Sequence, residues 1–111
     1  MRGTLLRFYV HENRRHHHVL LYDWLLEEAK QIGIRGGSAF RAIAGFGRRG
    51  TLHAEHFFEL AGDVAVEVEL AVTDDEAERM MARIRDEGIA VFYVRIAAEF
   101  GSINGGSPER G

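Results

Sequence analysis

The stretch VAVEVELAVTDDE, residues 64–76, decides how the rest of the chain is arranged. Within residues 64–72, Val or Leu occupies every even position, and Glu67 and Glu69 lie between them. This alternation predicts a β-strand with one buried face and one polar face. Thr73 and Glu76 follow at the spacing of a capping box, in which each side chain binds the backbone N–H of the other. The sequence therefore predicts a strand that leads directly into a helix.

Periodicity and turn residues predict further elements on both sides of this stretch. Upstream, polar and basic residues separate an alternating strand from an amphipathic helix that ends at a glycine. Downstream, the capped helix ends at Gly88 and an apolar strand follows. The predicted elements, in chain order, are a strand over 4–10, a loop over 11–18, a helix over 20–33, a strand over 38–46, the strand over 64–72, a helix over 73–88 and a strand over 89–96.

This order predicts an α+β fold, a ferredoxin-like βαββαβ sandwich, with an extended loop or hairpin over residues 45–62 between the second and third strands. Residues 1–98 form one domain, and the glycines, serines and proline of residues 99–111 predict a flexible tail. Right-handed crossovers put both helices on one face of the sheet. The residues expected on the other face are Leu5, Arg7, Tyr9, Arg41, Ile43, Glu67, Glu69, Val91, Tyr93 and Arg95, with Arg41 directed at Glu67 or Glu69.

The composition of the chain excludes several kinds of binding site and partner. The chain has 111 residues, a net charge of −3 and no cysteine, which excludes disulfides and Cys-based zinc sites. The sequence shows neither a signal peptide nor an apolar run of transmembrane length, so a cytoplasmic protein is expected. Lys and Arg predominate up to Ala54, and Asp and Glu predominate after it, a split that can mark an anion-binding end. No nucleic-acid partner is expected, because such proteins are usually basic overall.

The predicted topology brings three connections to one end of the sheet: residues 11–18, the 45–62 loop and the turn at 87–90. Arginines and histidines together outnumber the acidic residues in these connections, and Glu12 and Glu87 are the acids expected to oppose them strongly. The first helix also begins there, with its partial positive charge. We therefore expect an anion-attracting end. Its basic residues are Arg14, Arg15, His16, His17, His18, Arg48, Arg49 and His53.

The run ENRRHHHVLLYDWLLEEAKQIGIRGGSAFRAIAGFGRRGTLHAEHFFEL, residues 12–60, resembles a small PII-like family known as domain of unknown function 190. Its most specific parts are the basic His-rich loop before LLYDWL, the strand end FRAIAGFG and His53. With the Val-rich strand and the acidic helix start, the resemblance covers residues 4–97. Proteins of this family are similar in fold to nitrogen-regulatory PII proteins, which are trimers that bind adenine nucleotides between subunits. The resemblance implies a signalling or sensor protein rather than an enzyme.

The residue pattern and the resemblance together predict where a nucleotide binds. A turn bracketed by glycines lets backbone N–H groups approach a ligand, and adjacent arginines suit phosphate oxygens. The 45–62 loop is similar in position to the PII loop that contacts phosphates and partner proteins. The predicted nucleotide-binding residues are Gly45, Phe46, Gly47, Arg48, Arg49 and His53, with Arg15, His16 and His17 as secondary candidates that can reach from a neighbouring subunit.

The resemblance implies a homotrimer, AMP, ADP or ATP as ligand with no required cofactor, and an unidentified protein partner such as a membrane transporter or channel. The chain departs from PII proteins in two places. Residues 86–90, DEGIA, replace the glycine-lysine phosphate loop, and the 45–62 loop contains no tyrosine for nucleotidylation. A specific affinity for ATP and control by nucleotidylation are therefore not implied.

Other interpretations of the same residues remain open. The glycines at 45 and 47 can serve a solvated hairpin tip. Thr51 and His53 are the only nearby nucleophile–base pair, but they lack an orienting acid. The histidines can bind a divalent metal, yet adjacent residues rarely ligate one ion without a supporting turn, so no metal ligand is assigned and solvated or phosphate-facing histidines are favoured. The alternative function is a small hydrolase or metal-binding enzyme that uses this His- and Arg-rich end.

Overall fold

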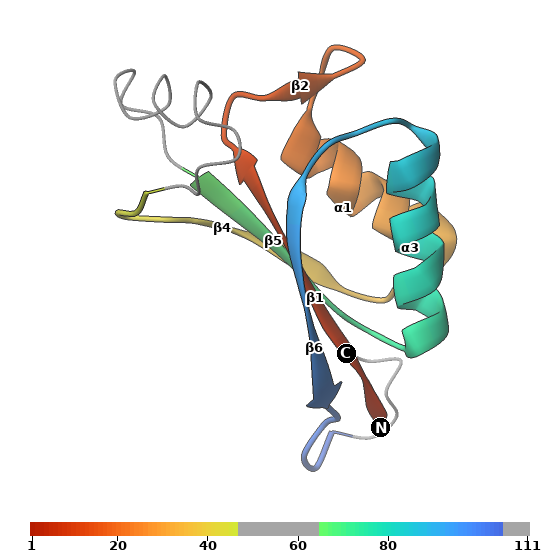
Figure 1. Cartoon of the computed structure of the whole chain (residues 1–111). Helices are drawn as coiled ribbons and strands as arrows, with labels where there is room; N and C mark the ends of the chain where they lie inside the picture. Colours follow the sequence, from red (N-terminus) through yellow and green to blue (C-terminus); the bar gives the residue numbers. More distant parts are fainter. Residues whose placement is uncertain (47–64, 106–111) are drawn as a thin grey trace.

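The computed structural model describes residues 1–46 and 65–105, and two helices cover one face of a four-stranded antiparallel sheet (Figure 1). The strand order is β4-β5-β1-β6, which confirms the predicted ferredoxin-like fold. A separate two-stranded sheet pairs β2 with β3. The elements are β1 (Arg2–His11), β2 (Arg15–His16), β3 (Val19–Leu20), α1 (Leu21–Ile32), β4 (Gly37–Arg41), β5 (Ala65–Val72), α3 (Asp74–Asp86) and β6 (Phe92–Glu99).

The core lies between the helices and the two central strands. Alternate residues of β1 and β5 point toward the helices, as the sequence pattern predicted, and one stripe of each helix meets them. The helices also end as predicted, because Gly33 and Gly88 adopt the left-handed conformation that suits glycine. The buried apolar residues of the core are Leu6, Phe8, Val10, Leu21, Leu25, Ala29, Ile34, Val66, Val68, Leu70, Val72, Ala77, Met80 and Ile84.

The capping box at the start of α3 is present as predicted. The Thr73 Oγ1 atom accepts a hydrogen bond from the Glu76 N–H at 3.1 Å, and the Glu76 Oε1 atom accepts one from the Thr73 N–H at 2.9 Å. Thr4 adds a link from the sheet, since its hydroxyl donates to the Asp74 carboxylate at 2.8 Å.

Neither helix of the described residues has the length and hydropathy needed to cross a membrane.

Several predicted boundaries were wrong. A short hairpin, β2–β3, replaces much of the loop expected over 11–18, and β4 ends at Arg41 rather than at residue 46. The last strand begins at Phe92 and continues to Glu99, beyond the expected start of the tail. It continues because Met1 and Phe100 exchange backbone hydrogen bonds of 2.9 and 3.0 Å, which hold this segment beside β1. Residues 47–64, which include most of the predicted 45–62 loop, lie outside the described part of the chain.

The face of the sheet away from the helices is called here the open face. The side of β6 that lies on the open face is the opposite of the predicted side. Residues directly opposite one another in an antiparallel pair share a face. Leu5, Arg7 and Tyr9 on the open face are opposite Ile96, Val94 and Phe92, respectively. The expected Tyr93 and Arg95 therefore lie on the helix side, where Arg95 pairs with Glu78 of α3 at 3.0 Å. Val91, also expected on the open face, packs against the core.

The same one-residue error affected β4. Phe40 is opposite Glu67 on the open face, whereas Arg41 is opposite the buried Val66. Arg41 therefore does not reach Glu67 or Glu69, and its Nε atom instead lies 3.0 Å from the Glu12 carboxylate.

Arg7 takes the place predicted for Arg41. Its Nε atom is 2.8 Å from Glu69 and 3.7 Å from Glu67. Ile43, also expected on the open face, follows the end of β4 and is almost fully exposed. The charged centre of the open face is thus a group of three side chains from β1 and β5.

Candidate functional site at the His16–Glu87 end

The candidate site lies where β1 ends and the β2–β3 hairpin begins. A backbone hydrogen bond of 2.7 Å from Leu21 N–H to the Arg14 carbonyl ties the start of α1 to this hairpin. The end of α3 reaches the same place, where Glu87 contacts His16. The end of β4 reaches it too, through the ion pair of Arg41 with Glu12. Figure 1 shows β2 beyond the end of β1 and close to the start of α1. The predicted meeting of connections at one end of the sheet is thus present among the described residues.

A tight turn sets the direction of three consecutive histidines. His16 pairs with Val19, so His17 and His18 form a two-residue hairpin loop. Both loop residues have positive φ angles, 52° and 68°, as the central positions of a type I′ turn require. Glycine or asparagine is the usual choice there, and a histidine in this conformation is strained. The turn is held by Arg15, whose Nη1 donates to the His18 carbonyl at 3.0 Å.

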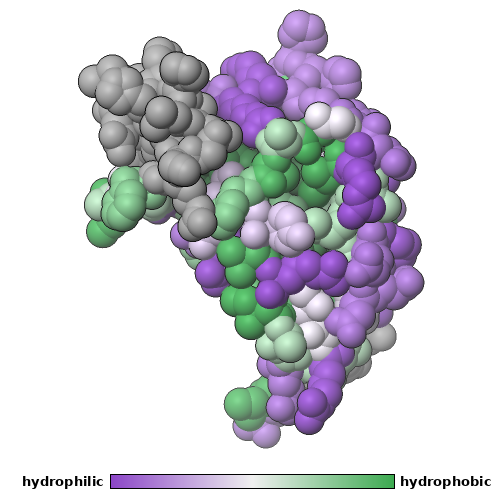
Figure 2. Space-filling view, viewed as in Figure 1, coloured by the Kyte–Doolittle hydropathy of each residue, from purple (hydrophilic) through white to green (hydrophobic). Residues whose placement is uncertain are grey.

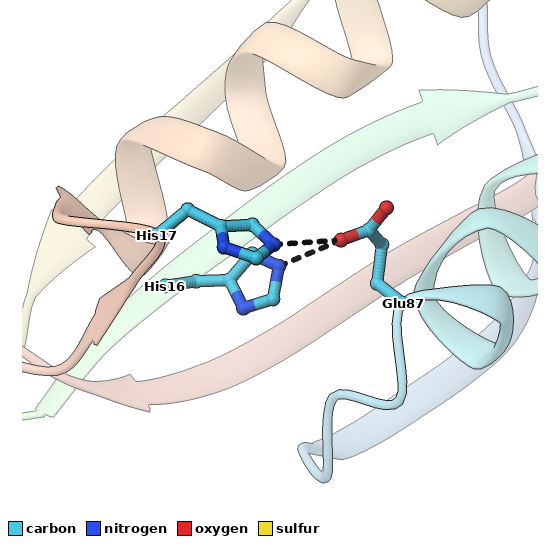
Figure 3. Close-up of side chains that lie close together, drawn as sticks. All are labelled: His16, His17 and Glu87. Carbon is cyan, nitrogen blue, oxygen red and sulfur yellow. Dashed lines mark hydrogen bonds and ion pairs between the residues drawn. The ribbon is translucent and has the colours of Figure 1, made fainter.

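The turn directs two imidazoles at one carboxylate, and Figure 3 shows both rings facing Glu87. The Nε2 atoms of His16 and His17 lie 2.8 and 3.4 Å from the Glu87 Oε1 atom. A carboxylate only accepts hydrogen bonds, so the His16 Nε2–H donates to it. The hydrogen bond from His16, with the charges of both imidazoles, lowers the pKa of Glu87. This end therefore favours an ionised carboxylate beside two histidines.

The two histidines differ in exposure. The His16 side chain is 17% exposed, because its ring meets Trp24 edge-on with centroids 5.1 Å apart. The His17 side chain is 74% exposed and its ring lies 4.1 Å from that of His16. His16 is thus anchored against α1, whereas His17 remains accessible to a ligand.

The end of α3 positions Glu87. Gly88 follows it with a φ of 70°, and the Gly88 and Ile89 N–H groups donate to the Arg85 and Ile84 carbonyls. This pair of bonds is a Schellman motif, which ends the helix at a defined residue and turns the chain away. The carboxylate that sequence reasoning treated only as an opposing charge is therefore held in place beside the histidines.

The structure describes five of the nine predicted nucleotide-binding residues. Arg15, His16 and His17 lie together in the β2–β3 hairpin, in the segment that was predicted to be a loop. Gly45 and Phe46 lie beyond β4, where Phe46 is 88% exposed. The other four, Gly47, Arg48, Arg49 and His53, lie outside the described residues, as do Thr51 and the 47–62 part of the loop.

The sequence pattern indicates the histidines as candidate site residues, but it does not indicate Glu87 as their partner. A useful signal was nonetheless present, because Glu12 and Glu87 were the two acids predicted to oppose this basic end strongly. Each pairs with a basic group there, Glu12 with Arg41 and Glu87 with His16.

Known proteins are similar to this chain in sequence and in fold. The sequence model of the DUF190 family, described as "Uncharacterized ACR", matches residues 3–92. A UPF0166 protein of Aquifex aeolicus (strain VF5) is 32% identical over 85 residues, which cover 77% of this chain and 81% of that protein. The crystal structure of a candidate PII-like signaling protein from Thermus thermophilus is similar, with a TM-score of 0.55 and 20% identity. The similarity covers 87% of this chain and 85% of that chain. The latter similarity concerns the fold, and it agrees with the predicted PII-like architecture.

Proposed function

This chain belongs to the DUF190 family, and on that premise we propose that it is a PII-like signalling protein rather than an enzyme. In this proposal, three copies assemble through their sheets and bind an adenine nucleotide, AMP, ADP or ATP, in the clefts between subunits. The protein works in the cytoplasm and signals through the 45–62 loop to a protein partner such as a membrane transporter or channel. The observation that carries the proposal is the open face of a PII-like sheet, where exposed apolar side chains surround the charged group of Arg7, Glu67 and Glu69.

The open face has the chemistry of a contact between copies of the chain. Phe40, Phe92 and Ile96 are between 42% and 52% exposed, and Tyr9 meets Phe92 with ring centroids 5.5 Å apart. Figure 2 shows hydrophobic side chains exposed beside β6, interrupted by hydrophilic ones. Exposed apolar surface of this kind, with polar groups among it, is typical of protein–protein interaction sites. Packing of the open faces around a threefold axis buries it.

The basic end of the sheet supports binding of phosphate groups. Arg15 and His17 are exposed there, and Arg41 at the end of β4 reaches the same end of the sheet through its ion pair with Glu12. In the proposal, the backbone of Gly45, Phe46 and Gly47 approaches the phosphates, and Arg48, Arg49 and His53 supply charged contacts. Arg15, His16 and His17 reach the same nucleotide from a neighbouring subunit.

Calorimetric titration of AMP, ADP and ATP into wild type and an Arg48→Ala/Arg49→Ala variant tests nucleotide binding. Charge-assisted contacts contribute roughly 1.5–3 kcal/mol each, so loss of two is expected to weaken binding by more than about tenfold. The matched control is Arg2→Ala/Arg35→Ala, which removes two exposed arginines from the other end of the sheet. Absence of binding to wild type contradicts the proposal, and formation of a product from the nucleotide supports the hydrolase instead.

A further inference from the structure

We propose that His16, His17 and Glu87 form a binding site for a divalent transition metal ion, with Zn²⁺ as the best match. Two imidazole nitrogens and one carboxylate oxygen suit Zn²⁺, whereas Mg²⁺ and Ca²⁺ prefer oxygen ligands alone. A His₂Glu set leaves at least one coordination position for water or a ligand, as open zinc sites do. The site does not depend on nucleotide binding.

The distances among the three side chains are close to those of a zinc site. The ligand atoms all lie within 4.8 Å of one another. Tetrahedral coordination with Zn–N bonds of about 2.0–2.1 Å puts neighbouring ligand atoms about 3.3 Å apart. The 2.8 and 3.4 Å separations from Glu87 Oε1 to the two Nε2 atoms bracket this value. An ion is admitted when side-chain rotation also brings the two Nε2 atoms, which lie within 4.8 Å of each other, to this separation.

The β2–β3 turn allows two adjacent histidines, His16 and His17, to serve as ligands of one ion. Adjacent side chains on an extended strand point to opposite faces. Here His16 ends a strand and His17 begins the turn with a φ of 52°, so that both rings reach the same carboxylate, as Figure 3 shows. The edge contact with Trp24 fixes the His16 ring. The supporting turn that sequence reasoning required is thus present.

Ion binding replaces the existing hydrogen bonds. Each imidazole must offer its Nε2 lone pair, so the proton it carries there moves to Nδ1 or is released to solvent. The metal then takes the place of the N–H donors facing Glu87, and the positive charge of the ion offsets the charge of the carboxylate.

The test is calorimetric titration of ZnCl₂ alone into nucleotide-free wild type and three variants. His17→Asn and Glu87→Gln each remove one ligand, from two different elements. His18→Asn is the matched control, because it changes the neighbouring residue of the same turn, and asparagine tolerates positive φ at both turn positions. Circular dichroism of each variant verifies the fold, and MgCl₂ serves as the control ion.

The proposal predicts that wild type and His18→Asn each bind one Zn²⁺ ion per chain. It also predicts that this site does not bind Mg²⁺ in either protein. Loss of a residue that only supports a metal ligand already weakens metal sites by about 10–100-fold, so loss of either ligand is expected to weaken this site at least tenfold. Wild-type affinity in both His17→Asn and Glu87→Gln overturns the assignment, and so does failure of wild type to bind up to millimolar zinc. Equal loss in His18→Asn overturns it as well. If His16, His17 and Glu87 serve only to link the hairpin to α3, one of these results that overturn the assignment is obtained.

Discussion

The Nε2 atom of His16 lies 2.8 Å from the Oε1 atom of Glu87, although the two residues are 71 positions apart in the chain. Their hydrogen bond connects the β2–β3 hairpin with the end of α3. The hairpin consists of two strands of two residues each. The position of the hairpin at the site therefore depends on Glu87 as well as on the contact between His16 and Trp24.

Acid should weaken this connection. The pKa of Glu87 is lowered in the folded protein, chiefly by the His16 hydrogen bond. A lowered pKa contributes stability that is fully present above the unfolded value, about 4.3, and is lost as pH falls through the lower folded value. Urea unfolding of wild type and Glu87→Gln from about pH 6 to about pH 3 should show a stability difference that disappears at low pH. The same difference at every pH contradicts this reasoning.

Two strand glycines should respond differently to an added methyl group. A Cβ at Gly3 overlaps the backbone carbonyl oxygen of Val72, whereas one at Gly37 meets the side-chain ends of Leu70 and Leu26. Leucine side chains can rotate, but the backbone of β5 can yield only if the strand moves. Gly3→Ala should therefore destabilise the fold by about 1–3 kcal/mol, and Gly37→Ala by less. Urea unfolding measures both variants, and equal effects contradict the distinction.

The α3 cap should contribute measurably to stability. Thr73→Ala removes the oxygen that accepts from the Glu76 N–H. Loss of such a cap costs about 0.5–2 kcal/mol of unfolding free energy. Chemical denaturation should show this decrease, while Thr73→Ser, which keeps the hydroxyl, should stay near wild type. A decrease as large in the serine variant points to the lost methyl group rather than the cap.

A charge on the open face should break the proposed trimer. Ile96 is 42% exposed in the single chain and lies opposite Leu5 on that face. Ile96→Glu should convert a trimer into folded monomers at micromolar concentration, because it buries a third carboxylate on a face where Arg7 already pairs with Glu67 and Glu69. Light scattering gives the mass. Ile103→Glu is the control, since Ile103 is 91% exposed and lies after β6. A monomeric wild type contradicts the trimer itself.

The central part of the fold could be predicted from the sequence because its pattern is unambiguous. Alternation along residues 64–72 and the Thr73–Glu76 spacing each have one straightforward structural meaning. The outer strands are different, since Phe92, Tyr93 and Val94 are consecutive apolar residues that fit either face. A one-residue shift there exchanges the faces of every side chain. That ambiguity explains why β6 was assigned to the wrong face, and in β4 the sequence GSAFR shows no alternation that could fix its face.

The candidate site was predictable only in outline. The topology correctly brought residues 11–18 and 87–90 to one end, and the composition identified that end as basic. The hairpin was missed because His17 and His18 are not the Asn-Gly pair that usually marks a type I′ turn. The His16–Glu87 contact depends on where α3 ends to within one residue. Local patterns do not determine such a long-range contact, so it required the three-dimensional structure.

The pairing of β1 with β6 has a mechanical consequence. Arg2 is opposite Glu99, and the next residues outward, Met1 and Phe100, are also hydrogen-bonded to each other. A pulling force applied at these two ends acts across the strands, so it breaks the hydrogen-bonded pairs one after another instead of loading them all together. The two strands should therefore separate pair by pair, starting at these ends, at low force. Because β1 is ten residues long, the His16–His17–Glu87 group at its far end is among the last parts to be stretched.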